Sequence, residues 1–187
     1  LQKLVDKSIS TISGSAFTKN ITGINDVPEH IFVFIDAALM IQVYNNLLSN
    51  AMKFTPQHGS IVVGISKTGN TRFIESTVTD SGKGIKPEDL PKLFDLETKF
   101  TTVGTSGEKG TGFGLTLVKE IIEKHGGSIG VESRVNEGTT FTFSMPQASS
   151  SILLIDDNST DRILYSKIMK SLIKDHEVHN ATTIKEG

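Results

Sequence analysis

The sequence predicts an α/β (α+β) domain, because helical and extended patterns alternate along most of its 187 residues. Apolar residues recur at helical spacing through 36–54, which indicates a long amphipathic helix. The segments 61–66 and 73–79 are typical of two strands joined by a turn at 68–70. A glycine-rich turn at 110–115 then opens a further helix. The chain is long enough for one good domain and a small remainder.

The first 35 residues predict one helix and two strands. Apolar residues in 1–12 form a short amphipathic stripe, typical of the end of a helix that enters from upstream. The segments 20–25 and 31–35 predict two strands joined by a turn that contains Pro28.

The helix predicted over 36–54 has two distinct faces. Asp36 is a plausible N-cap, and Pro56 lies just beyond the predicted end. The apolar face consists of Met40, Val43, Tyr44, Leu47, Leu48 and Ala51. A second stripe carries Gln42, Asn46, Asn50 and Lys53.

The second stripe favours a binding function over a plain solvated face. A solvated face would normally carry Glu and Lys, whereas each Asn here costs roughly half a kcal/mol of helix stability relative to Ala. An amide oxygen is a hard neutral ligand suited to Mg²⁺, and a lysine one turn further along suits phosphate.

The strand 73–79 is followed directly by the sequence DSGKGI, residues 80–85. Gly82 and Gly84 let the backbone approach a flat ligand, and the carboxylate of Asp80 can accept a hydrogen bond from an exocyclic amine such as that of adenine. An Asp-Ser-Gly sequence is also common in simple turns.

The region 87–125 predicts a short helix at 87–94, a polar loop at 95–109 and a helix at 117–125. A polar loop of this length is typical of a functional lid. The intervening GTGFGL turn, with Gly110, Gly112 and Gly114, offers N–H groups to phosphate at a helix N-terminus. The turn does not follow a strand, which argues against a Rossmann dinucleotide site. Strands at 128–133 and 139–145, with Gly138 at their turn, complete the domain.

Composition excludes several classes of function. The net charge is −2 with both signs interspersed, so neither nucleic-acid binding nor contact with a membrane is expected. The chain has no cysteine, which excludes disulfides and Cys-based metal sites and fits a reducing compartment. It begins at Leu1 without an initiator Met or a signal peptide, so we expect a fragment of a longer protein.

Five motifs occur in one order over 1–146, and together they resemble the catalytic ATP-binding domain of sensor histidine kinases. In this chain NLLSNAMKFT resembles the N box of that family, DSGKGI its first glycine box and LFDLETKF its phenylalanine box. Further along, GEKGTGFGL resembles the second glycine box and GTTFTFSMP the last box. The resemblance implies a two-layer sandwich of the GHKL/Bergerat type. In this fold a mixed sheet of about five strands packs against three helices, and ATP lies between sheet, helices and lid.

The resemblance also implies roles for single residues toward Mg-ATP. Asn50 would coordinate Mg²⁺, Asn46 would help to hold phosphate or metal, and Lys53 would contact phosphate. On the adenine side, Asp80 would bind the amine, Gly82 and Gly84 would leave room for the ring, and Thr139 would reach a water.

The lid and the second glycine box would surround the triphosphate through Gly110, Gly112 and Gly114. Lys99 and Lys109 fit either a phosphate contact or a solvated loop charge. The phenylalanine box departs from the commoner family pattern, because Asp95 and Leu96 follow Phe94.

After a linker at 147–151, residues 152–187 resemble the start of a response-regulator receiver domain. Asp156 and Asp157 lie where that family has its acidic pair for Mg²⁺. The resemblance predicts a hybrid kinase as the parent, in the cytoplasm or anchored to a membrane. The fragment itself is expected to be inert as a receiver, because the chain ends before the phosphoacceptor Asp.

The resemblance implies transfer of the γ-phosphoryl group of ATP to a histidine on an upstream dimerisation and histidine-phosphotransfer domain. No histidine of this chain has the expected helical context, so no catalytic residue is assigned and the isolated chain is expected to lack autophosphorylation. Two alternatives remain: an ATP hydrolase that shares the glycine boxes, and a nucleotide-responsive interaction module without chemistry. The residue one turn before Asn50 separates the hydrolase from the kinase, and the receiver domain is the expected downstream partner.

Overall fold

The computed structural model describes residues 1–66, 72–95, 104–108, 112–148, 151–155, 157–172 and 177–181. The chain divides into two compact units, 1–147 and 148–187. Each unit is described by itself.

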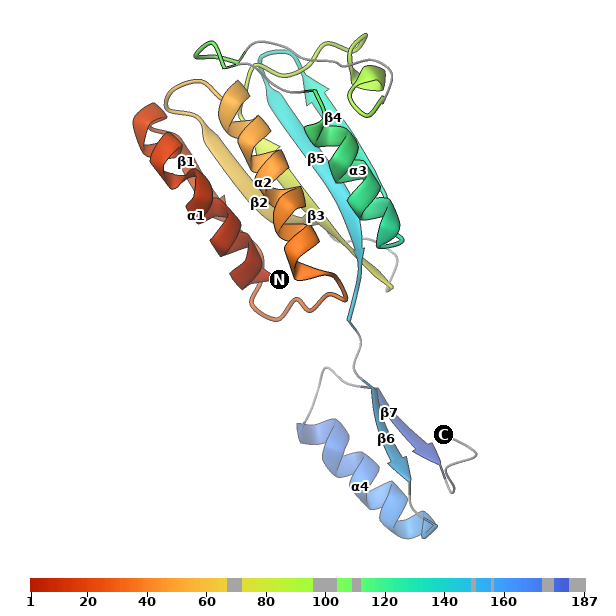
Figure 1. Ribbon diagram of the computed structural model, residues 1–187. Helices are drawn as coiled ribbons and strands as arrows, with labels where there is room; N and C mark the ends of the chain where they lie inside the picture. The colour runs from red at the N-terminus through yellow and green to blue at the C-terminus, as the bar shows by residue number, and fades with distance from the viewer. Residues whose placement is uncertain are drawn as a thin grey trace. The chain divides into compact units, whose positions relative to one another are not determined.

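The first unit is a two-layer α/β sandwich, as the sequence predicts. Its mixed five-stranded sheet has the order β1-β2-β3-β5-β4, in which only β1 and β2 run parallel. Three helices cover one face of this sheet (Figure 1). The helices are α1 (Gln2–Lys19), α2 (Ala37–Phe54) and α3 (Gly114–Lys124), and the strands are β1 (Thr22–Asn25), β2 (Ser60–Ser66), β3 (Phe73–Asp80), β4 (Ile129–Arg134) and β5 (Gly138–Pro146).

Helix α2 lies between α1 and α3 and supplies much of the core. All six residues of its predicted apolar face are buried. The Tyr44 ring packs edge-on against Phe143, and its hydroxyl lies 2.8 Å from the Ser76 hydroxyl of β3. This pairing satisfies a polar group that would otherwise be buried without a partner.

The ends of α2 are set by the residues that the sequence indicates. The Asp36 carboxylate accepts hydrogen bonds from the N–H groups of Ala38 (2.8 Å) and Leu39 (3.0 Å), which confirms the predicted N-cap. The helix ends at Phe54, before Pro56.

The pairing of β3 with β5 places two polar residues side by side beneath the helices. Asp80 is opposite Thr139, at the end of β3 and near the start of β5. Alternation along each strand points both side chains to the helix-covered face, together with Val78 and Phe141. A carboxylate is therefore buried at one edge of the hydrophobic core.

Two predicted elements near the N-terminus are wrong. The first helix does not end at residue 12 but continues to Lys19, where Asn20 adopts a left-handed conformation with φ 51°. The segment 31–35 is not a strand, because it makes a single bridge, from Val33 to Gln147, and has no ladder. Its apolar alternation reflects packing on one side only, since Phe32 and Phe34 are exposed.

Other boundaries differ from the predictions by smaller amounts. The helix predicted at 87–94 is only a 3-10 turn, η1, at Leu90–Lys92. Helix α3 starts at Gly114, three residues before the predicted start, because the glycine turn leads straight into it. The turn at 68–70 and most of the 95–109 loop lie outside the described residues.

The second unit contains β6 (Ser151–Ile155), α4 (Ser159–Leu172) and β7 (Glu177–Ala181). The two strands are parallel neighbours, so the unit is a βαβ arrangement that agrees with the predicted strand, turn and helix. The Asn158 side chain accepts from the N–H of Thr160 at 3.0 Å where α4 begins. Asp157 is exposed in the turn before α4, whereas Asp156 is outside the described residues.

Within the described part of the chain, none of the helices combines the length and the apolar character that crossing a bilayer requires.

Candidate functional site

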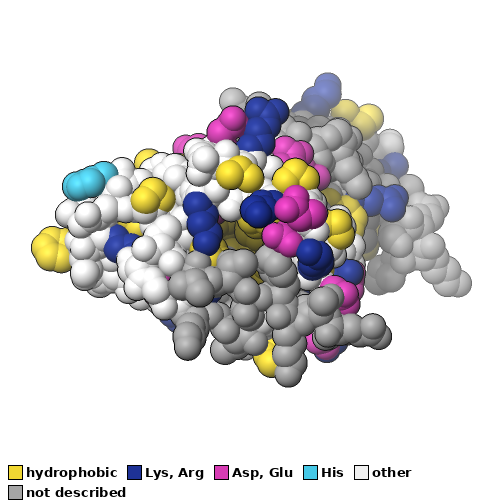
Figure 2. Space-filling view, turned by 90° about the horizontal axis from the view of Figure 1, so that it is seen from above, with side chains coloured by type: hydrophobic (Ala, Val, Ile, Leu, Met, Phe, Trp, Pro, Cys, Tyr) yellow, Lys and Arg dark blue, Asp and Glu magenta, His cyan; other side chains and the backbone are white. Residues whose placement is uncertain are grey.

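A cavity of about 540 Å³ opens where α2 ends, between the starts of α3 and β5 and the turn after β3. Seen from this end of the first unit, charged side chains lie along part of the rim of a hollow that has apolar side chains inside it (Figure 2). The cavity is lined by Asn46, Ser49, Asn50, Lys53, Phe54, Asp80, Lys83, Gly84, Ile85, Lys86, Asp89, Leu93, Gly112, Gly114, Leu115, Val135, Asn136, Thr139 and Phe141.

Helix α2 forms one wall through Asn46, Asn50 and Lys53, three of the four residues on its predicted polar stripe. The fourth, Gln42, is exposed and does not line the cavity. Its carbonyl accepts a hydrogen bond of 2.8 Å from the Asn46 amide, which leaves the Asn46 oxygen facing α3. A Cβ at Gly114 would lie 2.8 Å from that oxygen, so the two helices meet closely here.

Asp80 is the buried carboxylate of the cavity, with 6% of its surface exposed. One of its oxygens accepts from the N–H of Gly82 at 2.8 Å. Burial raises the pKa of Asp80 to about 6, although backbone hydrogen bonds from Gly82 and Thr139 oppose the rise. An acceptor with little access to water is suited to recognising a donor on a ligand.

The turn after Asp80 is held against the β4–β5 turn. The N–H of Asn136 donates to the Lys83 carbonyl at 2.8 Å, and the N–H of Ile85 donates to the Ser133 hydroxyl at 2.9 Å. Gly84 has φ +67°, and a Cβ there would overlap the carbonyl oxygen of Arg134. Only glycine fits this position without strain.

Two lysines of the cavity lining each contact the same aromatic ring, that of Phe54. The Nζ atoms of Lys53 and Lys83 lie 4.7 Å and 4.9 Å from the centroid of the Phe54 ring. Burial lowers the pKa of Lys53, and nearby Lys83 lowers it further, while Glu108 opposes both. A bound anion would relieve the repulsion between these two cations.

The structure brings together eight of the twelve residues predicted for the site: Asn46, Asn50, Lys53, Asp80, Gly84, Gly112, Gly114 and Thr139. Gly82 is not part of the lining and instead supports Asp80 through its N–H. Lys99, Lys109 and Gly110 lie outside the described residues.

Sequence reasoning missed Lys83, Asn136 and the apolar part of the lining, including Leu93, Leu115 and Phe141. The sequence did indicate a role for Lys83 in the site, because this residue lies between Gly82 and Gly84, two glycines that were predicted to line it. It contained no such indication for Asn136, since the place of that residue depends on the contact between two turns far apart in sequence.

Asn50, the residue predicted to coordinate Mg²⁺, lines the cavity with its neutral amide. Among the described residues, no group of three or more His, Cys, Asp or Glu side chains comes together. A metal ion at Asn50 would therefore need further oxygen ligands from a bound molecule. That requirement fits Mg²⁺ carried by phosphate groups.

The sheet order, the three covering helices and the cavity between them define a GHKL-type α/β sandwich. A family profile described as "Histidine kinase-, DNA gyrase B-, and HSP90-like ATPase" matches residues 35–149, more than half of the chain. The chain belongs to this family.

Curated relatives of this chain include sensor kinases. Sensor histidine kinase WalK of Bacillus subtilis is 35% identical over 124 residues, which cover 66% of this chain and 20% of that protein. Adaptive-response sensory kinase SasA of Synechocystis is 40% identical over 130 residues, which cover 68% of this chain and 33% of that protein. The chain thus spans a fifth to a third of the length of these relatives.

Solved structures give the same class. The catalytic domain of histidine kinase ThkA has a TM-score of 0.66 at 30% identity, covering 79% of this chain and 92% of that one. Full-length ShkA in complex with AMPPNP has a TM-score of 0.66 at 21% identity, covering 98% of this chain and 40% of that one. The likeness to ShkA shows the fold alone.

Proposed function

We propose that the first unit binds Mg-ATP in the 540 Å³ cavity and serves as the catalytic domain of a sensor histidine kinase. The observation that supports this most is a single cavity that combines a buried carboxylate acceptor, a helical amide–lysine wall and the glycine-rich N-terminus of a helix. These three features match the three chemical parts of the ligand: adenine, metal and phosphates.

On the adenine side, the Asp80 carboxylate accepts a hydrogen bond from the exocyclic amine. Gly84 has no side chain, so the turn after Asp80 leaves room for the adenine ring. Thr139 lies opposite Asp80 and supports a water on that side. On the phosphate side, the N–H groups at the start of α3 and the Lys53 ammonium attract negative charge.

For the metal, Asn50 supplies one amide oxygen and Asn46 lies one turn earlier on the same wall. Asn50 and Asn46 would hold Mg²⁺ on this wall, and the metal would supply positive charge that neutralises the phosphates. The protein then acts by positioning the γ-phosphoryl group toward a nucleophile from outside the cavity.

That nucleophile is a histidine on an upstream dimerisation domain, and the reaction belongs to two-component signalling. The relatives named above are sensor kinases, and ThkA has also been solved in complex with response regulator TrrA, with a TM-score of 0.64 at 26% identity.

The βαβ second unit supports a hybrid parent in which residues 152–187 begin a receiver domain. Sensor protein EvgS of Escherichia coli is 34% identical over 178 residues, which cover 83% of this chain and 14% of that protein. This match continues past residue 149, where the family profile ends. We place the domain boundary in the linker at 147–151.

An ATP hydrolase is the second candidate, because the family includes such enzymes. Hydrolysis needs a general base within hydrogen-bond reach of the attacking water. Asn46, one turn before Asn50, is an amide and cannot take a proton at neutral pH. The described lining has two carboxylates, and both already have partners. Asp80 accepts a hydrogen bond from the N–H of Gly82, and Asp89 forms an ion pair with Lys92 at 2.8 Å. The kinase is therefore favoured.

Calorimetry of nucleotide binding tests the proposal. Asp80→Asn should weaken ATP binding more than GTP binding, because it removes the acceptor for the adenine amine. Asn50→Ala should reduce the gain in ATP affinity that added Mg²⁺ provides. Asp26→Asn, at an exposed position, serves as the matched control. Unchanged ATP affinity in both site variants would contradict the assignment of this cavity.

A further inference from the structure

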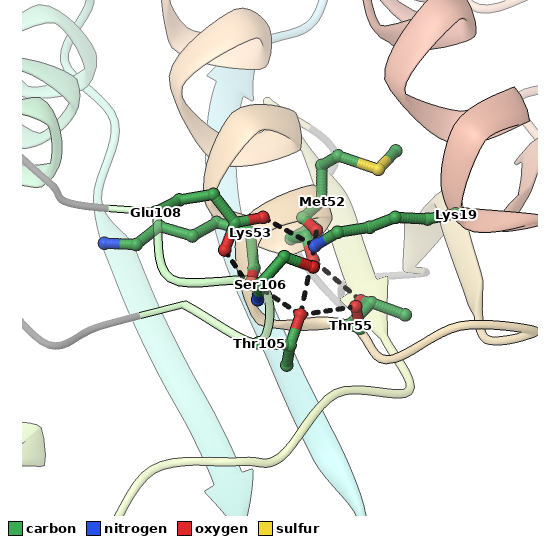
Figure 3. A network of polar contacts seen from close by, with 8 residues as sticks. Lys19, Met52, Lys53, Thr55, Thr105, Ser106 and Glu108 are labelled. Atoms are coloured by element: carbon green, nitrogen blue, oxygen red, sulfur yellow. Dashed lines mark hydrogen bonds and ion pairs between the residues drawn. The ribbon is translucent and has the colours of Figure 1, made fainter.

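The segment 104–108 caps the C-terminal end of α2 (Figure 3). Carbonyl groups in the last turn of a helix lack partners within the helix. Here the Lys53 carbonyl accepts from the N–H of Thr105 at 3.0 Å, and the Met52 carbonyl accepts from the Lys19 ammonium at 2.9 Å. The Thr105 hydroxyl also lies 3.1 Å from the Thr55 carbonyl oxygen. The end of α2 thus holds both this segment and α1.

Lys19 connects the end of α1 to the same segment. Its Nζ lies 2.7 Å from Oε1 of Glu108 and donates to the Thr105 hydroxyl at 3.0 Å, in addition to the Met52 carbonyl. An ammonium group has three donors, and these contacts use all three. The Lys19 side chain is only 14% exposed and that of Glu108 is 37% exposed. The pair is therefore more enclosed than an ordinary surface ion pair.

The second carboxylate oxygen of Glu108, Oε2, bonds within the segment 104–108. Oε2 accepts from the N–H of Ser106 at 2.9 Å, and the Glu108 carbonyl accepts from the N–H of Gly104 at 2.9 Å. The hydrogen bond from Lys19, together with weaker contributions from this turn, lowers the pKa of Glu108 to about 2. The carboxylate is thus bonded both within the turn and to α1.

The segment 104–108 lies directly against Lys53, a residue of the cavity wall. A Cβ at Gly104 would lie 2.6 Å from Cγ and 2.8 Å from the carbonyl oxygen of Lys53. Movement of the segment would therefore release both the backbone and the side-chain stem of Lys53. A few residues further along the chain, Gly112 and Gly114 line the cavity.

We propose that Lys19 and Glu108 form a clasp that positions Lys53 and the segment 104–108 for the phosphates of a bound nucleotide. Neither clasp residue lines the cavity, so both are positioning residues that act through Lys53. Because Lys19 is the last residue of α1, the clasp makes nucleotide affinity depend on how the end of α1 is held. This inference rests on the proposed binding of Mg-ATP.

Two single substitutions separate positioning from simple electrostatics. Lys19→Met removes a positive charge, and Glu108→Gln removes a negative charge, close to the phosphate side of the cavity. If charge alone mattered, the two variants would change the affinity for Mg-ATP in opposite directions. The clasp predicts that both weaken it, by about five- to tenfold each, and that the double variant is no weaker than either single variant.

Hydrogen exchange of the backbone amides gives a readout without nucleotide. In the full chain, the amides of Gly104, Thr105 and Ser106 should exchange at least about tenfold faster in either variant, while amides in the centre of the sheet stay unchanged. Coupling is reciprocal, so Mg-ATP should slow exchange of the same amides in the wild-type protein.

The exposed pair Lys124–Glu120 on α3, at 2.8 Å compared with 2.7 Å for Lys19–Glu108, provides the matched control. Lys124→Met and Glu120→Gln should change neither Mg-ATP affinity nor exchange at 104–108. Wild-type binding of Mg-ATP together with opposite or absent effects of the two clasp variants would overturn the clasp alone. A wild-type chain that does not bind Mg-ATP would instead overturn the proposed function, and with it the effect of the clasp on affinity.

Discussion

The ligand contact proposed for Asp80 would come at a cost to the stability of the fold. Its position at the end of β3 buries the carboxylate opposite Thr139, where few water molecules can solvate the charge. The N–H of Gly82 compensates for part of that loss. An adenine amine would add a further donor, so the residue is better satisfied in the complex than in the free protein.

We expect Asp80 to make the free protein less stable as the pH rises. The pKa is 3.8 in the reference state and about 6 in the folded protein, so the folded state binds more protons between these values. The free energy of unfolding should therefore fall through this window and level off above pH 6. From pH 4.5 to pH 7.5 the loss due to Asp80 should be about 2 kcal/mol, at 1.36 kcal/mol per pH unit.

Urea unfolding of the wild-type protein and of Asp80→Asn, without nucleotide, measures this loss. The variant has no charge to bury, so its stability relative to wild type should improve by the stated amount over that pH range. Parallel pH profiles for the two proteins would show that Asp80 ionises alike in the folded and unfolded states.

At the scale of elements, local signals in the sequence were enough for α2, for the hairpin β2–β3 and for β4–β5. In each case the spacing of the apolar residues agrees with a residue that marks the boundary, as with Asp36 before α2 and Gly138 at the start of β5. The false strand at 31–35 has the right period but no neighbouring strand to form a ladder with. Alternation of apolar residues shows that one side of a segment is buried, whereas a strand also needs a neighbouring strand whose N–H and C=O groups pair with its own.

The candidate site was predictable where one element carries several of its residues, as α2 does with Asn46, Asn50 and Lys53. It was not predictable where two turns meet, as they do through Asn136 and Lys83. The extension of α1 to Lys19 was missed because its last turns have few apolar residues to mark a buried face. The clasp was therefore invisible from the sequence.

Two glycines in different elements should respond to alanine in opposite ways. Gly14 is in the interior of α1, and a Cβ added there would meet no atom within 4 Å, so Gly14→Ala should raise the free energy of unfolding by about 0.5–1 kcal/mol. Gly84→Ala should lower it by about 2 kcal/mol or more, because φ is +67° and the Arg134 carbonyl occupies the space.

Chemical denaturation measures the free energy of unfolding of both glycine variants. Gly130→Ala in β4 is the control, because a Cβ added there would meet no atom within 4 Å. A destabilised Gly14→Ala would mean that α1 is packed more tightly on that side than the structure indicates. A neutral Gly84→Ala would mean that the turn after β3 can move away from the β4–β5 turn.

At the scale of the whole molecule, every described residue that lines the cavity belongs to the first unit. The described part of the cavity also brings no carboxylate from α2. Under the proposed function, the first unit holds and orients the nucleotide, and the acceptor of the phosphoryl group is expected from another domain.

We expect the isolated chain to release negligible phosphate from ATP and to remain unlabelled by radioactive ATP. Transfer should occur only when the upstream helical domain of the parent is supplied in cis or in trans. Asn46→Glu is the informative variant, because it places a possible general base one turn before Asn50 and should raise turnover slightly. Robust turnover by the wild-type chain, lost in Asn50→Ala, would favour the hydrolase.

The pairing of β3 with β5 also has a consequence for the order of folding. These central strands meet through residues 61 positions apart, such as Thr79 and Thr140, whereas α2 and the hairpin β2–β3 form from local contacts. Closing so long a loop costs entropy before any pairing compensates for it, so the centre of the sheet should form late. Asp80 and Thr139 come together only at that step. A nucleotide that needs both residues should therefore leave the folding rate unchanged and slow unfolding. The nucleotide-bound domain should then resist proteolysis, and the protection should grow with the fraction of chains that carry nucleotide.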